Sequence, residues 1–165
     1  MIKLYLRSEN GISAYREAWA EESRIVEHWG PLGERGETRD HPLDPAVDAD
    51  EQVRAVLAGA VADGYAEIDE DDHAFLVIEY ALSGDWPDDA QQQKLHALHG
   101  RLDETLGWTG LGHVDGSSAG SGTMEVTCAV VDFATAQRVV TNDLEGTEFA
   151  DFARIYDEAA DDDTD

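Results

Sequence analysis

Carboxylates interrupt almost every apolar segment of this chain, and they constrain what it can fold into. The 165 residues include 37 Asp and Glu against 11 Lys and Arg, which gives a formal net charge of −26. Because the excess runs from Glu9 to Asp165, nearly the whole folded surface must carry carboxylates. Such a surface repels itself in dilute buffer and destabilises the compact state.

The same charge predicts an environment of high salt. At molar salt the screening length falls to roughly 3 Å, and the repulsion largely disappears. Two lysines, Lys3 and Lys94, stand against nine arginines. Abundant acid with scarce lysine resembles the cytoplasmic proteins of salt-accumulating archaea. In dilute buffer this surface disfavours DNA, RNA and anionic membranes as partners, because phosphate repels carboxylate.

The composition nevertheless predicts a folded cytoplasmic protein. Hydrophobic residues make up 42% of the chain, which is too many for a disordered acidic segment. The single Cys128 excludes an internal disulfide framework and favours a reducing cytoplasm. The apolar run from Ile2 to Leu6 is too short for a secretion signal, and no stretch approaches the roughly 20 apolar residues of a membrane span.

The first half, residues 1–72, predicts an antiparallel sheet with one helix across it. The alternation from Ile2 to Arg7 predicts a strand, and Asn10-Gly11 predicts a tight turn before further strands at 12–20 and 24–29. After Asp48 the apolar spacing becomes helical, and Gly64 stands where the helix would end. Residues 65–68 could return as a short strand.

The second half, residues 73–157, predicts a ferredoxin-like unit. Its expected elements are a strand at 74–80, a helix from Asp88 to Gly107, a glycine-rich section at 107–122, a strand at 124–133, a helix at 134–142 and a strand at 153–156. Strand, helix, hairpin, helix, strand is the order of the ferredoxin-like βαββαβ unit. Residues 158–165 predict a frayed acidic tail. The expected fold class is therefore α+β.

One segment carries a family resemblance. The run from Trp29 through Gly30, Gly33 and Gly36 to Arg39 resembles the signature of the WGR domain, and the predicted helix ends in Asp63-Gly64-Tyr65, similar to the family's Lys-Gly-Tyr. The resemblance implies a binding module, which in poly(ADP-ribose) polymerases contacts DNA ends and neighbouring domains. Pro31 replaces the Arg of the family's name, and Glu37 stands where the family prefers Gln.

Two segments are candidates for ligand binding. Arg35, Arg39 and His41 form the most basic local cluster, which could bind a phosphate or carboxylate or pair with the acidic residues between them. The glycine-rich loop that begins at Trp108 is the second, because loops of this kind often carry function. Its candidate ligand-binding residues are Trp108, His113 and Asp115.

A third candidate is a metal site in the second half. His96, His99 and Asp103 lie three and four residues apart, so a helix places them on one face. Two imidazoles and a carboxylate suit zinc or a similar divalent metal, and His113 and Asp115 could complete the set. The alternative is a polar border of the helix with no metal. No other cofactor is expected.

These features favour a non-catalytic binding protein whose ligand, a macromolecule or a small molecule, occupies the sheet or the groove between the halves. Two alternatives stay open. One is a metal-dependent enzyme that uses the His/Asp cluster, and the other is an acidic inhibitor of a basic partner such as a nuclease. Trp19, Trp86 and an exposed sheet face could also support a homodimer.

Overall fold

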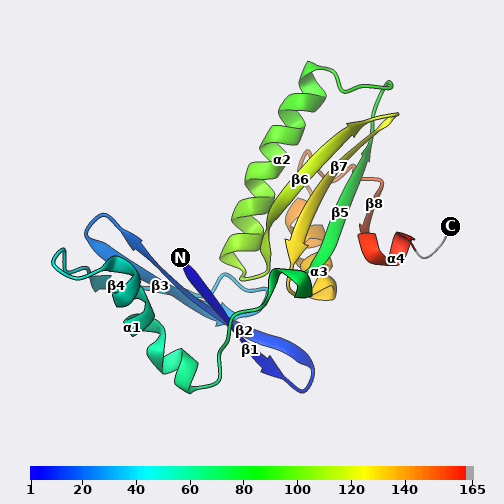
Figure 1. The fold of residues 1–165 in the computed structure, drawn as a ribbon. Helices are drawn as coiled ribbons and strands as arrows, with labels where there is room; N and C mark the ends of the chain where they lie inside the picture. The colour runs from blue at the N-terminus through cyan, green and yellow to red at the C-terminus, as the bar shows by residue number, and fades with distance from the viewer. Residues whose placement is uncertain (163–165) are drawn as a thin grey trace.

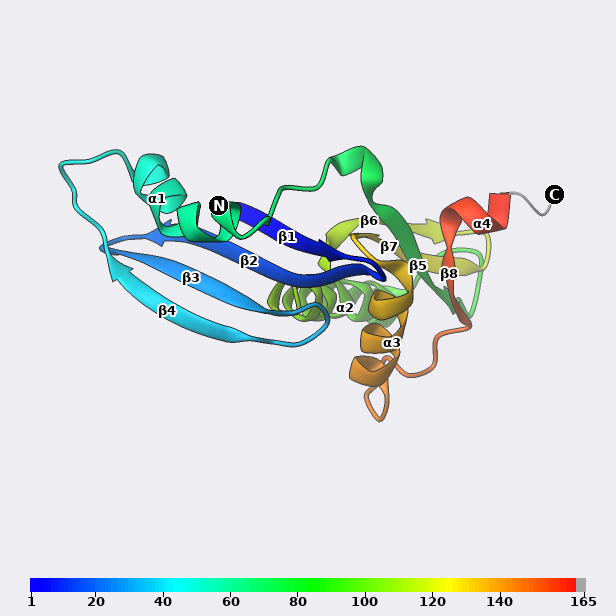
Figure 2. The ribbon, with the colours of Figure 1, turned by 90° about the horizontal axis from the view of Figure 1, so that it is seen from below.

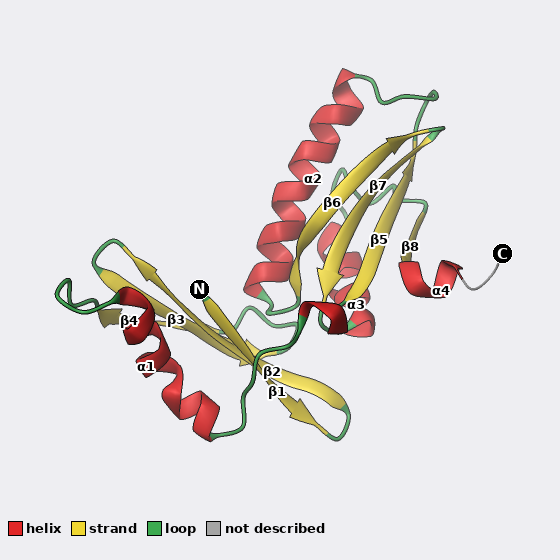
Figure 3. Cartoon of the chain, viewed as in Figure 1, coloured by secondary structure: helices red, strands yellow, loops and turns green. Residues whose placement is uncertain are grey.

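The computed structural model describes residues 1–162, which form two four-stranded sheets, one from each half of the chain (Figure 1). All neighbouring strands in these sheets run antiparallel. Helices pack against both sheets, as Figure 3 shows. The chain therefore has the α+β fold class that the sequence predicts.

The first sheet is a meander in which each strand pairs with the next along the chain. Its strands are β1 (Ile2–Ser8), β2 (Gly11–Glu21), β3 (Arg24–Pro31) and β4 (Glu37–Pro42). The alternation of the sequence predicts the first three. It does not predict β4, because most side chains of that strand are exposed and only its pairing with β3 defines it.

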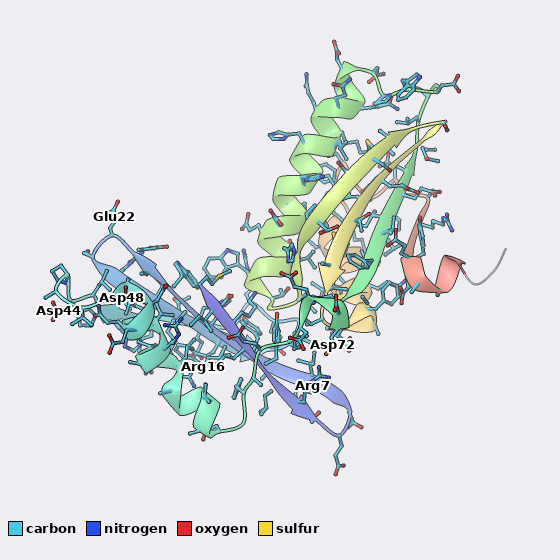
Figure 4. The ribbon with its side chains drawn as sticks, in the orientation of Figure 1. Arg7, Arg16, Glu22, Asp44, Asp48 and Asp72 are labelled. Atoms are coloured by element: carbon cyan, nitrogen blue, oxygen red, sulfur yellow. The ribbon has the colours of Figure 1, made fainter. Side chains whose placement is uncertain are left out.

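Helix α1 (Ala49–Ala62) crosses one face of this sheet. Asp48, labelled in Figure 4, caps it by accepting a 3.0 Å hydrogen bond from the Glu51 N–H. The buried side chains between helix and sheet include Val53, Leu57 and Ala60 from α1 and Leu4, Ala18 and Ile25 from the strands. Full burial of an aliphatic side chain stabilises the fold by about 1.5–3 kcal/mol, so this small core holds α1 in place.

The second sheet has the strand order β6-β7-β5-β8. Its elements along the chain are β5 (Ala74–Ala81), α2 (Asp89–Trp108), β6 (Gly112–Gly120), β7 (Thr123–Val130), α3 (Phe133–Leu144) and β8 (Arg154–Asp157). This is the predicted order of strands and helices. Figure 2 shows α2 and α3 on one face of the sheet, where they bury Leu98, Leu102 and Leu106 in the larger core.

Two segments differ from the sequence-based expectation, and for a third, the first strand of the expected hairpin, the sequence gives no bounds. The glycine-rich section contains the nine-residue strand β6, whose small side chains give no pattern but whose backbone pairs with β7. Of the short strand expected at 65–68, only a bridge between Tyr5 and Ala66 forms, and the turn η1 (Glu70–Asp72) follows it. Where the sequence predicts an acidic tail, Glu158–Asp162 form helix α4, and residues 163–165 lie outside the described residues.

Candidate functional site

The loop between β3 and β4 joins the two halves. The Gly33 N–H donates a 2.9 Å hydrogen bond to the carbonyl of Thr109, just after α2. The Tyr15 hydroxyl lies 2.9 Å from the Glu34 carbonyl and 3.1 Å from the Trp108 carbonyl. Burial raises the pKa of Tyr15, so its hydroxyl stays protonated and its one hydrogen can be donated to either of these oxygens. One side chain thus fixes the loop to the end of α2.

A row of charged side chains crosses the first sheet on the face opposite α1. The strand register places Lys3, Glu17 and His28 side by side. The Lys3 Nζ lies 3.0 Å from Glu17 Oε2, and the His28 Nδ1 lies 2.8 Å from Glu17 Oε1. His28 is 0% exposed and Glu17 is 4% exposed. A carboxylate that has lost nearly all its water depends on such partners.

His28 faces oxygen atoms with both ring nitrogens. Its Nδ1 lies beside Glu17, and its Nε2 lies 2.6 Å from the Arg35 carbonyl and 3.0 Å from the Tyr15 hydroxyl. Carboxylates and carbonyls only accept hydrogen bonds, so each ring nitrogen of His28 lies next to an acceptor. The Trp108 ring covers His28 edge-on, with ring centroids 4.9 Å apart. The joint between the halves, made of the β3–β4 loop, Tyr15, His28 and the end of α2, is therefore built around a buried hydrogen bond between His28 and Glu17.

A groove of about 760 Å³ opens beside this joint. One wall is the face of the first sheet that carries Tyr5, Glu17 and Trp19, and the others are residues 67–73, the end of α2 and the start of β6. Trp108, which is 37% exposed, presents its ring to the groove from α2. The carboxylates in its lining are Glu17, Glu67, Glu70, Asp103 and Glu104. The groove is therefore aromatic and acidic.

Ion pairs and backbone bonds tie the walls of the groove together. Arg7, labelled in Figure 4, lies 3.6 Å from Asp72 of η1. The Tyr5 N–H and carbonyl exchange hydrogen bonds with Ala66 at 2.8 and 3.0 Å. These contacts hold residues 66–72, the last residues of the first half, beside β1.

The structure brings some of the predicted ligand-binding residues together and separates others. Trp108 and His113 both line the groove. Arg35 lies next to it, where its guanidinium pairs with Glu104 at 2.8 Å. Asp115 is exposed at the irregularity in the pairing of β6 with β7, outside the groove lining.

Arg39 and His41 lie elsewhere, on the face of the first sheet that α1 crosses. The guanidinium carbon of Arg39 stacks 5.3 Å from the centre of the Trp29 ring, and Arg16 stacks on the same ring at 5.4 Å. The His41 Nε2 lies 2.7 Å from a carboxylate oxygen of the buried Glu27. The predicted basic cluster of Arg35, Arg39 and His41 is therefore split, because Arg35 belongs to the loop between β3 and β4 whereas Arg39 and His41 lie on β4.

The predicted metal ligands do not form a metal site. Within residues 1–162, no three His, Cys, Asp or Glu side chains are placed to hold a metal ion. His96 is exposed, and Asp103 accepts a 2.8 Å hydrogen bond from the Val114 N–H. His99 leaves its Nε2 buried with no hydrogen-bond partner in the described part of the chain. The helical spacing of His96, His99 and Asp103 instead follows the border between α2 and β6.

Cys128 belongs to the larger core and not to the site. It is fully buried on β7. Burial, followed by the charges of Asp103 and Asp115, raises the pKa of the Cys128 thiol to about 12. The thiol is therefore protonated at neutral pH, and it packs as a small apolar side chain.

Sequence reasoning missed the residues at the centre of the site, Lys3, Glu17 and His28. The signal was present in β2, where Tyr15, Glu17 and Trp19 alternate and so share one face. A carboxylate between two aromatic residues on one strand face indicates a buried charge. The pairing of that charge with Lys3 and His28 depends on the register of three strands.

No protein-family model matches the chain, and neither a curated protein nor a solved structure matches it. In the described part of the chain, no helix combines the length and the apolar character that crossing a membrane requires.

Proposed function

We propose that the protein is a non-catalytic binding protein whose ligand occupies the groove between its two halves. The observation that carries this proposal is the position of Trp19 and Trp108 in the lining of a groove of about 760 Å³. Clefts of roughly 300–1,000 Å³ with aromatic walls and a few placed polar groups are typical of ligand sites.

The polar groups of the groove support binding more than catalysis. The buried carboxylate of Glu17 is held by Lys3 and His28, so it is not free to transfer a proton to a ligand. Glu104 pairs with Arg35, and Asp103 accepts a backbone N–H. A general acid or base must reach the reacting atoms of its substrate, and these groups are already engaged.

In this proposal the resemblance to the WGR signature reflects a similar local fold and not a shared ligand. Gly36 has a φ of +67°, and a Cβ there would collide with the Trp29 carbonyl. The loop also anchors Tyr15 and His28, which bind the carbonyls of Glu34 and Arg35. Packing of the joint is therefore sufficient reason for this glycine spacing, and we propose no DNA-end binding.

The salt-adapted character is part of the same proposal. At molar salt the screening length is roughly 3 Å, so a charged surface attracts or repels little beyond direct contact. Recognition then depends on short-range contacts in a groove, which aromatic side chains supply. Trp19 and Trp108 are in position to make them.

A fragment screen tests the proposal. Fragments that bind the wild-type protein in molar KCl, detected by saturation-transfer NMR, should bind the Trp19→Ala variant roughly tenfold more weakly, as expected for an aromatic contact in a binding site. The indole N–H of Trp19 donates only to Glu21, an exposed neighbour, so the substitution leaves the joint intact.

Trp86→Ala is the matched control, because Trp86 is 75% exposed and lies outside the groove lining. Fragments should bind this variant as they bind the wild-type protein. Equal binding to both variants, or no fragment that binds the wild-type protein, would contradict the proposal.

A further inference from the structure

Two carboxylates of the groove have no cationic partner in the described part of the chain. Glu67 and Glu70 are exposed, and neither side chain forms an ion pair or hydrogen bond within residues 1–162. They face the same groove as the rings of Trp19 and Trp108. Carboxylates next to aromatic faces attract a guanidinium or ammonium group, because the ring and the carboxylate both favour positive charge.

The groove also exposes a backbone donor and acceptor on the edge of β1. Tyr5 uses its outer N–H and carbonyl to bind Ala66. In an antiparallel ladder residues two apart face the same way, so Lys3 points its N–H and carbonyl toward the same outer edge. In the described part of the chain, no group bonds to them, because the segment after Ala66 diverges from β1.

We propose that the occupant of the groove is an extended peptide segment that carries an arginine or lysine side chain. The inference rests on the proposed function and names its partner. The peptide backbone pairs with Lys3 at the edge of β1, and the basic side chain lies between the indole rings and the carboxylates of Glu67 and Glu70. Addition of a strand to an exposed sheet edge is an established mode of peptide recognition.

An extended peptide satisfies both features, whereas a small amine satisfies only one. The peptide backbone supplies a carbonyl and an N–H that pair with the N–H and carbonyl of Lys3. The apolar residues on either side of its basic residue contact Ile2 and Ile68 in the groove lining. A free amine leaves the edge of β1 unpaired. The preference for a peptide over a free amine therefore depends on where its basic side chain lies relative to the backbone groups that pair with the edge of β1.

The experiment uses four probes in molar KCl, with binding measured by calorimetry. The first is a short acetylated peptide with a central arginine flanked by valine and threonine. The second carries glutamate in place of the arginine, and the third has an N-methyl group on the central backbone nitrogen. The fourth is arginine amide. The first peptide should bind, and the glutamate and N-methyl peptides should each bind roughly fivefold or more weakly.

The double variant Glu67→Gln and Glu70→Gln tests whether the negative charges of the groove contribute to peptide binding. Both residues are exposed, so the variant keeps the fold, and it should bind the arginine peptide roughly fivefold more weakly. The control is Glu9→Gln with Glu148→Gln, which removes the same charge from exposed positions outside the groove lining. That control should bind as the wild-type protein does.

The outcomes separate this inference from the proposed function. Fragments that bind through Trp19 while the arginine peptide does not bind would overturn the peptide partner and leave the groove as the site. Equal affinity for the arginine and glutamate peptides would overturn the cationic specificity. Arginine amide that binds as tightly as the peptide would overturn the strand pairing.

Discussion

Replacement of His28 with alanine should lower the free energy of unfolding by about 4 kcal/mol, because it empties a fully buried site and leaves the buried Glu17 carboxylate with Lys3 as its one partner in the described part of the chain. Glu17 is 4% exposed and bonds to His28 at 2.8 Å. The substitution also removes the donor to the Arg35 carbonyl, which holds the loop of the joint. Urea unfolding in molar KCl, followed by circular dichroism, measures the loss.

His41→Ala is the matched control, since His41 also pairs with a buried carboxylate, that of Glu27, at 2.7 Å. Glu27 keeps Arg16, whose Nε lies 2.7 Å away, and the His41 side chain is 29% exposed, so its removal leaves neither an uncompensated charge nor an empty buried site. The control should lose about 1 kcal/mol, the usual net value of a hydrogen bond. Equal losses in the two variants would show that Glu17 does not depend on His28.

Replacement of Gly110 with alanine should destabilise the protein by about 3 kcal/mol through a collision and an unfavourable backbone angle. Gly110 follows α2 with a φ of +71°, and a Cβ there would overlap the ring of Tyr15. The Tyr15 ring cannot move away, because its hydroxyl is within hydrogen-bond distance of the Glu34 carbonyl in the first half and of the Trp108 carbonyl in the second. The same urea titration measures the effect.

Gly146→Ala separates the collision from the backbone angle. Gly146 has a φ of +73°, and a Cβ there would meet no atom within 4 Å. This control should lose about 1 kcal/mol, the cost of the left-handed backbone alone. If the two variants unfolded at the same urea concentration, the collision of the added Cβ at position 110 with Tyr15 would contribute nothing to the loss of stability.

The sequence predicts the elements of this fold whose own side chains show a pattern. Alternation predicts β1 to β3, and capping residues with apolar spacing predict α1 and α2. It does not predict β4, and it predicts β6 only as an unbounded part of the hairpin in the ferredoxin-like unit, because both strands are defined by backbone pairing with a neighbour, while their side chains are exposed or small.

The candidate site was predictable in part for the same reason. The glycine-rich loop indicates Trp108 and His113, and both line the groove. The hydrogen bond of Glu17 with His28 depends on the register of β2 with β3, which no local pattern gives. Residue spacing alone also grouped Arg35 with Arg39, although Arg35 lies in the loop between β3 and β4 and the Arg39 side chain packs against Trp29 on the sheet.

The central claim, that ligand binds in the groove between the halves, is tested most directly by the indole N–H signals of the four tryptophans in isotope-labelled protein. Titration with the arginine peptide in molar KCl should shift the signals of Trp19 and Trp108, which line the groove. The signals of Trp29 and Trp86, which lie outside it, should stay in place. Shifts confined to Trp29 or Trp86 would contradict the account.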